Sequence, residues 1–570
     1  MAIIGIDLGT TNSLAAVYRN GTVELIPNSL GEYLTPSVVS FGENGEVFAG
    51  NIAKQMLVTK PECTFREFKR NMGTDFEYTA GRRKYRPEEL SAFVLRKLKE
   101  DAERYLGEEV TEAVISVPAY FNDDKRCATK NAGKLAGLKV ERLINEPSAV
   151  ALKHHRESDE METFLVFDFG GGTLDVSLVE AFENVVEIKA VAGDNALGGK
   201  DFNEAIAQEF LRRHDLALLT PEEEEIILKE AEQLKIMLST EKEAMRRFML
   251  RGREYVMQMT NQELIHSAVE LFRRMAKPIQ KVINDSGMEE GEIDKIILVG
   301  GSSKMPVVKQ YIKSIVKIPV VSDDKPDESI ALGVGMAAAI KERTGDVRDM
   351  LLADICPFSL GTEVYDGSFS PIIERNDTLP CSRSKYYVTV QDFQKELEFN
   401  IYQGENMVAA DNLLLGKLTI KNLPLEPRGR AGAMATFLYD INGILDVRIE
   451  SKNETVHKVI FNKKMGLSEA EIEKRVEQLK KQTFYPASQE ENRLLIERAK
   501  SVYQETDPRS REAIANALHQ FRGALQYGSN QQIRAQYVQL SVLLAAVEQR
   551  QVHLKEFDEN FFDDSCLEEE

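Results

Sequence analysis

The 570-residue chain has no apolar run of the roughly 18 to 20 residues that a membrane-spanning helix needs. It also has no excess of basic residues: 72 Lys and Arg stand against 92 Asp and Glu, and the formal net charge is −20. Nucleic acid and anionic membrane are therefore disfavoured as main partners, because a surface that binds phosphate must be basic.

Cysteine is also scarce, and the five cysteines do not have the spacing of metal ligands. This pattern predicts reduced thiols in a cytosol. A strand is expected from about Ile3, which leaves no room for a signal or transit peptide, so the sequence predicts a cytoplasmic protein. The cysteines are Cys63, Cys127, Cys356, Cys381 and Cys566.

What the chain does have is length, which is too great for a single core and predicts three or four domains. Apolar residues make up 43% and charged residues 29%, as in ordinary soluble globular proteins.

The most informative stretch is residues 164–176, FLVFDFGGGTLDV, in which an apolar strand ends on Asp168 and breaks at Gly170, Gly171 and Gly172. Backbone N–H groups at such glycines can approach a polyphosphate closely, because no Cβ is in the way. Asp168 could hold Mg²⁺ through its waters. One stretch of this kind fits an ordinary glycine-rich hairpin equally well.

A second copy favours the phosphate-binding interpretation. Residues 3–17, IIGIDLGTTNSLAAV, repeat the order of an apolar strand, an aspartate (Asp7) and a glycine turn with hydroxyls. Two such hairpins indicate a duplicated lobe, with a nucleotide between the lobes and Asp7 and Asp168 facing each other across the metal. A glycine pair after the strand IILV, Gly300 and Gly301, could admit a base or ribose, although alone it is only a tight turn.

These hairpins, together with VPAYFND, INEPSAVAL and LVGGSSKMP, resemble the signatures of the DnaK-type chaperones, the seventy-kilodalton heat-shock protein family. The resemblance runs from residue 3 to about 465 with the motifs in family order, and more loosely through the helical end. It implies a multidomain fold with a two-lobed α/β, actin-like (duplicated ribonuclease H-like) ATPase domain. A β-sandwich peptide-binding domain and an α-helical lid would follow.

The domain limits implied are 1–345 for the nucleotide-binding domain, 346–355 for an interdomain linker, 356–465 for the β-sandwich, and 466–570 for the lid and acidic tail. The pattern of residues supports the division. Residues 349–355, DMLLADI, form a short apolar run between acids, and residues 359–461 alternate in short strands with turn signals such as INGI. Helices are expected over 489–505, over 508–527 and to about residue 555.

The resemblance implies an ATP-dependent chaperone that binds extended apolar peptide segments and releases them under control of slow ATP hydrolysis. Lys69, Glu146, Asp168 and Thr173 would be catalytic, and Asp7 and Asp168 would hold Mg²⁺; K⁺ is a further cofactor by resemblance. From the residues alone, 65–70 is a short basic helix with Lys69 on a solvated face, and Glu146 is a partner of a helix dipole.

Two positions near the implied nucleotide site depart from the family. Lys200 stands where relatives usually carry an acid, and Ile236 offers no guanidinium to stack on the base. The residues implied to bind ATP or ADP are Gly9, Thr10, Thr11, Asn12, Gly170, Gly171, Gly172, Thr173, Gly198, Gly199, Glu232, Lys235, Ser239, Gly300, Gly301, Ser302, Lys304 and Asp327.

The alternation in ELEFNIY buries one face of a strand, which is core in the simplest interpretation and a peptide groove by resemblance. By family position the groove residues are Thr362, Tyr365, Tyr387, Val390, Leu397 and Phe399, of which the first two are more polar than is usual. The residues implied to couple the domains are Pro118, Arg126, Leu351, Leu352 and Asp354.

The partners implied are unfolded or extended polypeptides and a J-domain co-chaperone, for which Arg142, Asn145 and Asp354 match the docking positions; a nucleotide exchange factor is left open. The lid looks short, and the ending SCLEEE lacks the terminal motif of cytosolic eukaryotic members, which suggests a divergent, HscC-like bacterial branch. Three rivals stay open: an actin-like filament ATPase, a sugar kinase on the same core, and an ATP-sensing scaffold without turnover.

Overall fold

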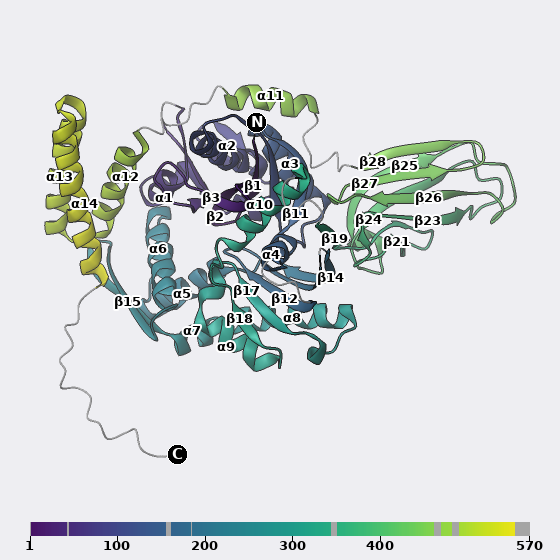
Figure 1. Ribbon diagram of the computed structural model, residues 1–570, viewed down its shortest axis with the longest axis horizontal. Coiled ribbons are helices and arrows are strands. Elements are labelled where there is room, and N and C mark those ends of the chain that lie inside the picture. Colours follow the sequence, from purple (N-terminus) through teal and green to yellow (C-terminus); the bar gives the residue numbers. More distant parts are fainter. Residues whose placement is uncertain are drawn as a thin grey trace, which may run out of the picture.

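The computed structural model shows two lobes with a cavity between them, a β-domain on one side and C-terminal helices on the other (Figure 1). The residues it describes are 2–42, 45–155, 161–183, 185–343, 350–460, 469–480 and 489–552. The predicted boundaries at 345/346 and 465/466, residues 346–349 of the predicted linker and the acidic tail lie outside the described residues. No helix within these ranges is both long and apolar enough to cross a membrane.

The first lobe is built on a mixed sheet in the order β11-β10-β1-β2-β3, to which β4 adds through β2. β1 pairs parallel with β10 and antiparallel with β2, so the first glycine turn lies at the end of a central strand. The strands are β1 (Ala2–Asp7), β2 (Asn12–Arg19), β3 (Thr22–Ile26), β4 (Thr35–Pro36), β10 (Val110–Val117) and β11 (Lys139–Asn145).

Helices cover both faces of this sheet, and smaller sheets lie beside it. The helices are α1 (Asn51–Thr59), α2 (Pro87–Leu106), α3 (Asp123–Leu135), α4 (Glu146–His155) and α10 (Ser329–Glu342). The additional strands are β5 (Val38–Phe41), β6 (Val47–Ala49), β7 (Thr64–Arg66), β8 (Tyr78–Ala80) and β9 (Arg83–Tyr85).

Local sequence accounts for α2. It begins with Pro87 in its first turn, where a missing N–H costs nothing, and the carboxylate of Glu89 accepts a hydrogen bond of 2.8 Å from the backbone N–H of Arg86. It ends at Gly107, whose φ of 71° is a left-handed conformation that glycine adopts without strain. Both ends of this helix are therefore set by residues within one turn of it.

The predicted helix over 65–70 is wrong. Thr64–Arg66 is strand β7, which pairs with β5, and Phe68–Asn71 is a single 3-10 turn. The partner strand comes from residues 38–41, far away in the sequence, so local pattern could not reveal it. The turn buries Phe68 and Lys69, which places the lysine inside the protein rather than on a solvated face.

The second lobe repeats the arrangement of the first, with a hairpin of central strands and parallel strands beside it in the order β18-β17-β12-β13-β14-β19. β12 pairs antiparallel with β13 around the second glycine turn and parallel with β17. The strands are β12 (Glu162–Phe169), β13 (Leu174–Phe182), β14 (Val185–Asp194), β17 (Lys295–Val299), β18 (Val320–Ser322) and β19 (Leu351–Ile355).

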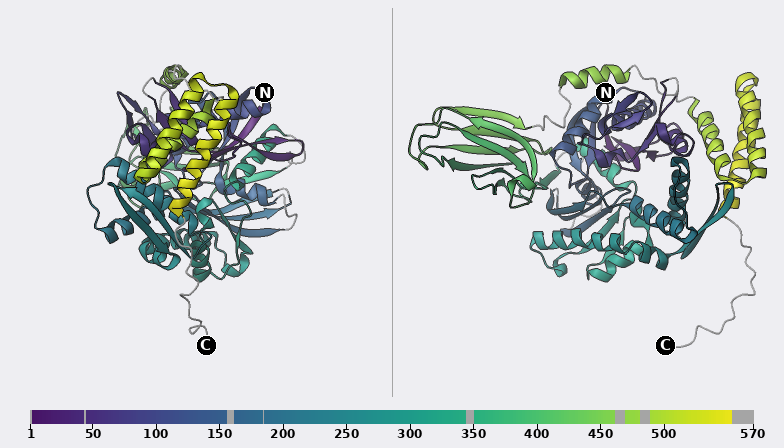
Figure 2. Two further views of the ribbon diagram at one scale, coloured as in Figure 1. Left: turned by 90° about the vertical axis from the view of Figure 1, so that its left-hand side faces the viewer. Right: turned by 180° about the vertical axis from the view of Figure 1, so that it is seen from behind.

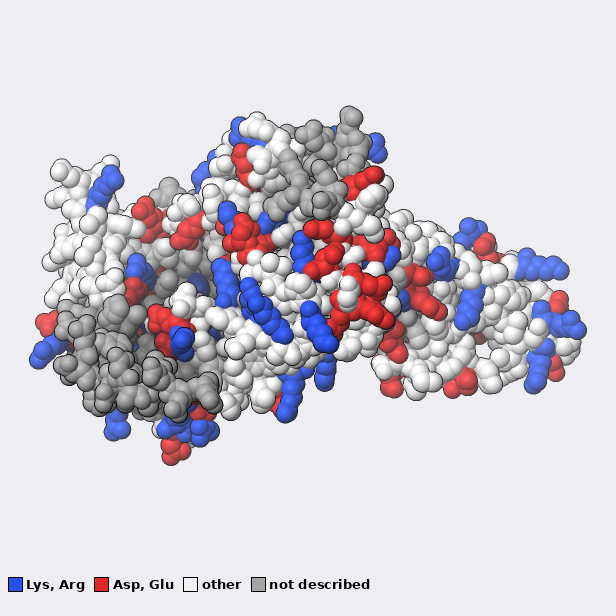
Figure 3. Space-filling model, turned by 60° about the horizontal axis from the view of Figure 1, so that its bottom comes forward, with Lys and Arg blue, Asp and Glu red and all other residues white. Residues whose placement is uncertain are grey.

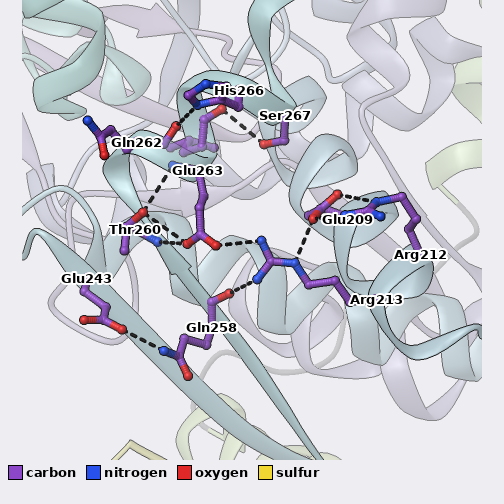
Figure 4. A network of polar contacts seen from close by, with 11 residues as sticks. Glu209, Arg212, Arg213, Glu243, Gln258, Thr260, Gln262, Glu263, His266 and Ser267 are labelled. Carbon is purple, nitrogen blue, oxygen red and sulfur yellow. Dashed lines mark hydrogen bonds and ion pairs between the residues drawn. The ribbon is translucent and has the colours of Figure 1, made fainter.

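The outer part of this lobe is a set of helices with a two-stranded hairpin. Arg213 on α5 donates hydrogen bonds to Glu209, to Glu263 on α7 and to the carbonyl of Gln258 on β16, which ties the hairpin to the helices (Figure 4). The elements are α5 (Gly199–His214), α6 (Pro221–Met237), α7 (Asn261–Ser267), α8 (Val269–Ser286), α9 (Pro306–Ile315), β15 (Glu243–Leu250) and β16 (Arg253–Thr260).

The β-domain consists of two antiparallel four-stranded sheets, in the orders β21-β20-β24-β25 and β23-β26-β27-β28, around one shared core. The predicted turn INGI joins β26 and β27, and Gly443 adopts a φ of 72° there. The strands are β20 (Leu360–Glu363), β21 (Phe369–Ile373), β22 (Thr378–Leu379), β23 (Cys381–Val388), β24 (Leu397–Gln403), β25 (Leu413–Ile420), β26 (Gly432–Tyr439), β27 (Leu445–Glu450) and β28 (Thr455–Ile460). Of these, β22 pairs with β19.

The C-terminal helices lie against the two lobes, with three of them on the side opposite the β-domain (Figures 1 and 2). Ile472 and Leu479 of α11 join the core of the first lobe. α12, α13 and α14 form a bundle with its own apolar core, centred on residues such as Leu495, Phe521 and Leu544. The helices are α11 (Glu469–Lys480), α12 (Glu490–Glu505), α13 (Pro508–Tyr527) and α14 (Asn530–Val552).

Candidate functional site

A cavity of about 560 Å³ opens between the two lobes, and both glycine turns line it. Most of the predicted nucleotide-binding residues are therefore brought together, although they come from five separate segments of the chain. Those that line the cavity are Gly9, Thr10, Thr11, Asn12, Gly170, Gly171, Thr173, Glu232, Lys235, Ser239, Gly300, Gly301, Ser302, Lys304 and Asp327.

Three predicted residues, Gly172, Gly198 and Gly199, lie behind the cavity wall. The N–H of Gly199 donates to the carbonyl of Gly170 at 3.0 Å, so the loop before α5 supports the second glycine turn. A Cβ on Gly172 would lie 2.5 Å from Cγ2 of Thr10, so the two glycine turns are in direct contact. A side chain at Gly172 would force the turns, and with them the lobes, apart.

Lys69 and Glu146 form a buried ion pair at the floor of the cavity. Nζ of Lys69 donates to Oε1 of Glu146 at 2.8 Å, and each side chain is only 5% exposed. Burial alone would lower the pKa of Lys69, but Glu146 and Asp7 raise it above its ordinary value. Lys69 therefore stays charged over the physiological pH range and faces the space between the turns.

Two buried aspartates, Asp7 and Asp168, line the same floor. Burial, reinforced by Glu146, raises the pKa of Asp7 to about 7, although Ser116 donates a hydrogen bond to it at 2.8 Å. Burial and Glu146 also hold the pKa of Asp168 well above its usual range. Lys69 is the one cation whose charge lowers the pKa of both aspartates, so the carboxylates here outnumber the positive charges beside them.

Asp175 belongs to this cluster and was missed as a site residue. Burial and the charge of Glu146 raise its pKa to about 7, and its Oδ1 accepts the backbone N–H of Tyr120 at 3.2 Å. The sequence held a signal, because Asp175 stands two residues beyond Thr173 at the start of β13.

The carboxylate cluster fits a divalent cation. Buried acids crowded around a single lysine are stabilised when a cation enters, because each then regains a charged partner. Within the described residues no three acidic, histidine or cysteine side chains are grouped as direct metal ligands. A hard cation such as Mg²⁺ commonly keeps several waters and binds phosphate oxygens, so Asp7 and Asp168 could hold it through water.

Ion pairs join the lobes beside the cavity, and one of them accounts for Lys200. Nζ of Lys200 lies 2.7 Å from Oε2 of Glu67, which comes from the first lobe. Arg70 of the first lobe likewise binds Asp201 of the second at 2.7 Å. The basic residue that departs from the family pattern therefore forms a contact across the cleft.

At the other end of the cavity, α6 supplies Lys235 and Ile236. Burial lowers the pKa of Lys235 to about 8, and its Nζ donates to the carbonyl of Gly199 at 2.9 Å. Ile236 is 52% exposed, so its side chain can contact a flat base through apolar packing instead of the stacking that a guanidinium would provide. Lys304 pairs with Asp327 beside the glycine pair at 300 and 301.

Comparison with known proteins identifies the family. The Hsp70 protein family matches residues 3–560. This chain belongs to the Hsp70 family. The chaperone protein DnaK of Thermotoga petrophila is 40% identical over 496 residues, which cover 84% of this chain and 83% of that protein. Like other Hsp70 proteins, it is an ATPase and an ATP-dependent chaperone that binds unfolded polypeptides. The family binds ATP or ADP with Mg²⁺ and works with co-chaperones.

In this Hsp70 the residues predicted for the peptide groove do not share one open surface. Thr362 and Phe399 are buried, at 1% and 2% exposure, and the hydroxyl of Thr362 donates to the carbonyl of Asn400 at 3.0 Å. Tyr387 and Leu397 are half-buried against the same core, whereas Tyr365 and Val390 are exposed. A peptide that contacts all six would require the sheets to shift.

The predicted coupling residues of the Hsp70 nucleotide domain lie at the contact with the β-domain. Pro118 is buried, and Arg126 donates to Oδ1 of Asn145 at 2.6 Å while lying beside Gly443 of the β26–β27 turn. The N–H of Leu143 donates to Oδ1 of Asn442 in that turn at 3.1 Å.

Asp123 was missed by the sequence analysis and lies at the centre of the contact between the domains. Tyr439 and Gln403 of the β-domain donate to its Oδ1 at 2.7 and 3.1 Å. Burial raises the pKa of Asp123 to about 6, against the lowering effects of Tyr439 and Arg126.

The described part of the linker is strand β19, which pairs parallel with β14 of the nucleotide domain. Met350 and Ile355 are buried and Leu352 packs on the core, but Leu351 is 64% exposed. Leu351 and Leu352 were predicted to have the same coupling role, but successive side chains of a strand point to opposite faces, so only Leu352 faces the core. Asp354 accepts a hydrogen bond of 3.0 Å from Ser148.

Proposed function

We propose that Lys69, Glu146, Asp168 and Thr173 carry out ATP hydrolysis in this protein. The observation that supports this assignment is the buried Lys69–Glu146 pair between the two glycine turns. The ammonium of Lys69 would stabilise negative charge on the transferred phosphoryl group, and Glu146 and Thr173 would orient the attacking water. Preorganised groups in a buried site need little rearrangement during the reaction.

Asp7 and Asp168 would hold Mg²⁺ through water, and backbone N–H groups of the two glycine turns would hold the phosphates. Mg²⁺ supplies neutralising charge to the phosphates. We include K⁺ as a second cation, because the buried carboxylates of Asp7, Asp168, Asp175 and Glu146 outnumber the one lysine paired with them. The cavity end with Lys235, Ile236 and Ser239 would receive the adenosine.

The observed arrangement, with β19 and the β-domain bound to the nucleotide domain, would be the ATP-bound, fast-exchanging state. After hydrolysis the linker and β-domain would separate from the lobes, and the peptide would be held in slow exchange. We propose the domain limits given above for the sequence. We also propose that the protein acts in the cytoplasm and that its partners are unfolded polypeptides and a J-domain co-chaperone. The two rival functions, an actin-like filament ATPase and a sugar kinase, leave the presence of residues 356–555 unexplained.

The test is to measure ATP turnover and the affinity for a fluorescent Leu-rich peptide on one preparation, with and without nucleotide. A working chaperone hydrolyses ATP slowly and loses peptide affinity when ATP is added. A scaffold without turnover would bind ATP and peptide without hydrolysis, and this outcome would refute the catalytic assignment.

The contact through Asp123 predicts that docking of the β-domain depends on pH. The docked state raises the pKa of Asp123 to about 6, above the 3.8 of an ordinary aspartate, so docking is favoured by proton uptake. Docking should strengthen by roughly 1 kcal/mol as pH falls from 7.5 to 5.5, because the docked carboxyl becomes mostly protonated in this range while an undocked one stays ionised. Energy transfer between dyes on the two domains, measured with ATP, reports docking.

Asp123→Asn is the matched variant for this measurement, because it keeps the shape of the side chain and cannot titrate. Its docking should be nearly independent of pH in the same range. An equal pH slope in the two proteins would assign the dependence to other groups, such as Asp124 beside it.

A J-domain protein with a basic helix should raise ATP turnover in a salt-sensitive way. Acidic side chains gather on the nucleotide domain next to the β-domain (Figure 3), and attraction to this surface is screened by salt. Asp354 is half-buried and bound to Ser148 at the edge of the linker strand. Asp354→Asn should weaken stimulation while basal turnover persists; full stimulation of this variant would place the docking site elsewhere.

A further inference from the structure

The three-helix bundle of α12, α13 and α14 lies across one side of the nucleotide cleft (Figure 2). Beneath it are α1 of the first lobe and α6 of the second. These two helices also line the cavity, with Lys54 and Leu57 from α1 and Leu228 and Glu232 from α6. The bundle therefore covers the place where the lobes meet at the outer end of the nucleotide site.

α12 is attached to the first lobe by both apolar and charged contacts. Leu494 packs on the apolar cluster of α1 and its neighbours, and the guanidinium of Arg493 lies 5.2 Å from the ring centre of Phe48. Oε2 of Glu490 accepts a hydrogen bond of 3.1 Å from Nζ of Lys97, whose side chain is 7% exposed. Ser29 donates to the same carboxylate.

The other end of α12 is attached to the second lobe. Nζ of Lys229 on α6 lies 2.7 Å from both oxygens of Glu505 and 3.1 Å from the hydroxyl of Ser501. The side chain of Glu505 is 2% exposed and that of Lys229 is 32% exposed, so the carboxylate of this ion pair is shielded from water. α12 and α14 also pack on β15 of the same lobe.

From these contacts we infer that the C-terminal bundle is a clasp that holds the nucleotide cleft closed. This inference rests on the proposed ATP site in the cleft. Opening the cleft moves α1 away from α6. Because α12 is attached to both lobes, the cleft cannot open while both attachments are intact. Detaching either end separates an ion pair in which the carboxylate is largely shielded from water, which is costly. Bound nucleotide is therefore released only after the bundle detaches from one lobe.

The bundle can detach as a unit because it has a core of its own. Leu495, Phe521 and Leu544 are buried among the three helices rather than against the lobes. Detachment therefore need not unfold the helices.

The test is the dissociation rate of a fluorescent, non-hydrolysable ATP analogue from the full-length protein, chased with excess unlabelled ATP, because the clasped arrangement is the one proposed for the ATP-bound state. Lys229→Met removes the attachment to the second lobe, and Leu494→Asp removes that to the first. Each change should raise the rate about tenfold or more, as expected for loss of a buried attachment. The double variant should be no faster than the faster single variant, because one free end already opens the clasp.

Arg213→Gln is the matched control, because it breaks ion pairs on the outer part of the second lobe (Figure 4) and should leave the rate unchanged. If Lys229→Met does not fold, Glu505→Gln breaks the same pair with almost no change in shape. An unchanged rate in the folded second-lobe variant would overturn the clasp, even if Leu494→Asp had an effect. Failure of the unaltered protein to bind the fluorescent ATP analogue would instead refute the proposed nucleotide site.

Discussion

Lys69→Ala is expected to lower single-turnover ATP hydrolysis by about 10² or more, the usual scale for loss of one preorganised electrostatic group. The buried pair of Lys69 with Glu146 strengthens this expectation, because the variant loses the cation and leaves Glu146 without its partner. ATP binding should stay nearly intact, because the glycine turns and the adenosine end of the cavity are unchanged. Rapid mixing with a limiting amount of ATP measures the hydrolysis step directly.

Lys84→Ala is the control for this experiment. It removes a lysine of the same lobe from an exposed pair with Glu77, and turnover should not change. Normal turnover in Lys69→Ala would assign Lys69 a structural role. Loss of ATP binding would show that Lys69 stabilises bound ATP itself rather than the transition state of hydrolysis.

Leu352→Asp is expected to abolish the release of peptide that ATP triggers, while ATP binding and peptide binding persist. Leu352 packs on the core of the nucleotide domain when β19 pairs with β14. Burial of a leucine is worth roughly 1.5 to 3 kcal/mol, and a carboxylate in its place would have to lose water as well. Such a change is large enough to shift an equilibrium between docked and free linker states.

Leu351→Asp provides a matched control within the same strand, because Leu351 is 64% exposed in the docked state. It adds the same charge but should leave most of the ATP-triggered release in place. Stopped-flow release of a fluorescent peptide compares the two variants. Hydrogen exchange over residues 350–355 adds a direct observation, and equal protection with ATP and with ADP would remove the linker from the mechanism.

The local parts of the nucleotide site could be predicted from the sequence. The two turns with Gly9 and with residues 170–172 depend on backbone chemistry that a few neighbouring residues specify. The limits of α2 were predictable for the same reason, since Pro87, Glu89 and Gly107 act within one turn of the helix. The role of Lys69 came from the family resemblance, because the pattern of residues favoured a solvated helix.

The residues that the sequence analysis missed act through distant partners. Asp123 is separated by more than 250 residues from Gln403 and Tyr439, which bury its carboxylate. Glu67 pairs with Lys200 across the cleft. No periodicity within one segment records such a pair, so burial and charge at these positions become visible only when the segments are folded together.

The sequence by itself determined where the two glycine turns and α2 form and that the last described residues are helical, because these depend on side chains a few positions apart. The tertiary structure decided where the elements lie. It placed α12 across the two lobes, through Lys97 at one end and Lys229 at the other, rather than over the β-domain. It also turned Leu351 outward and Leu352 inward, because pairing with β14 fixes which face of β19 is buried.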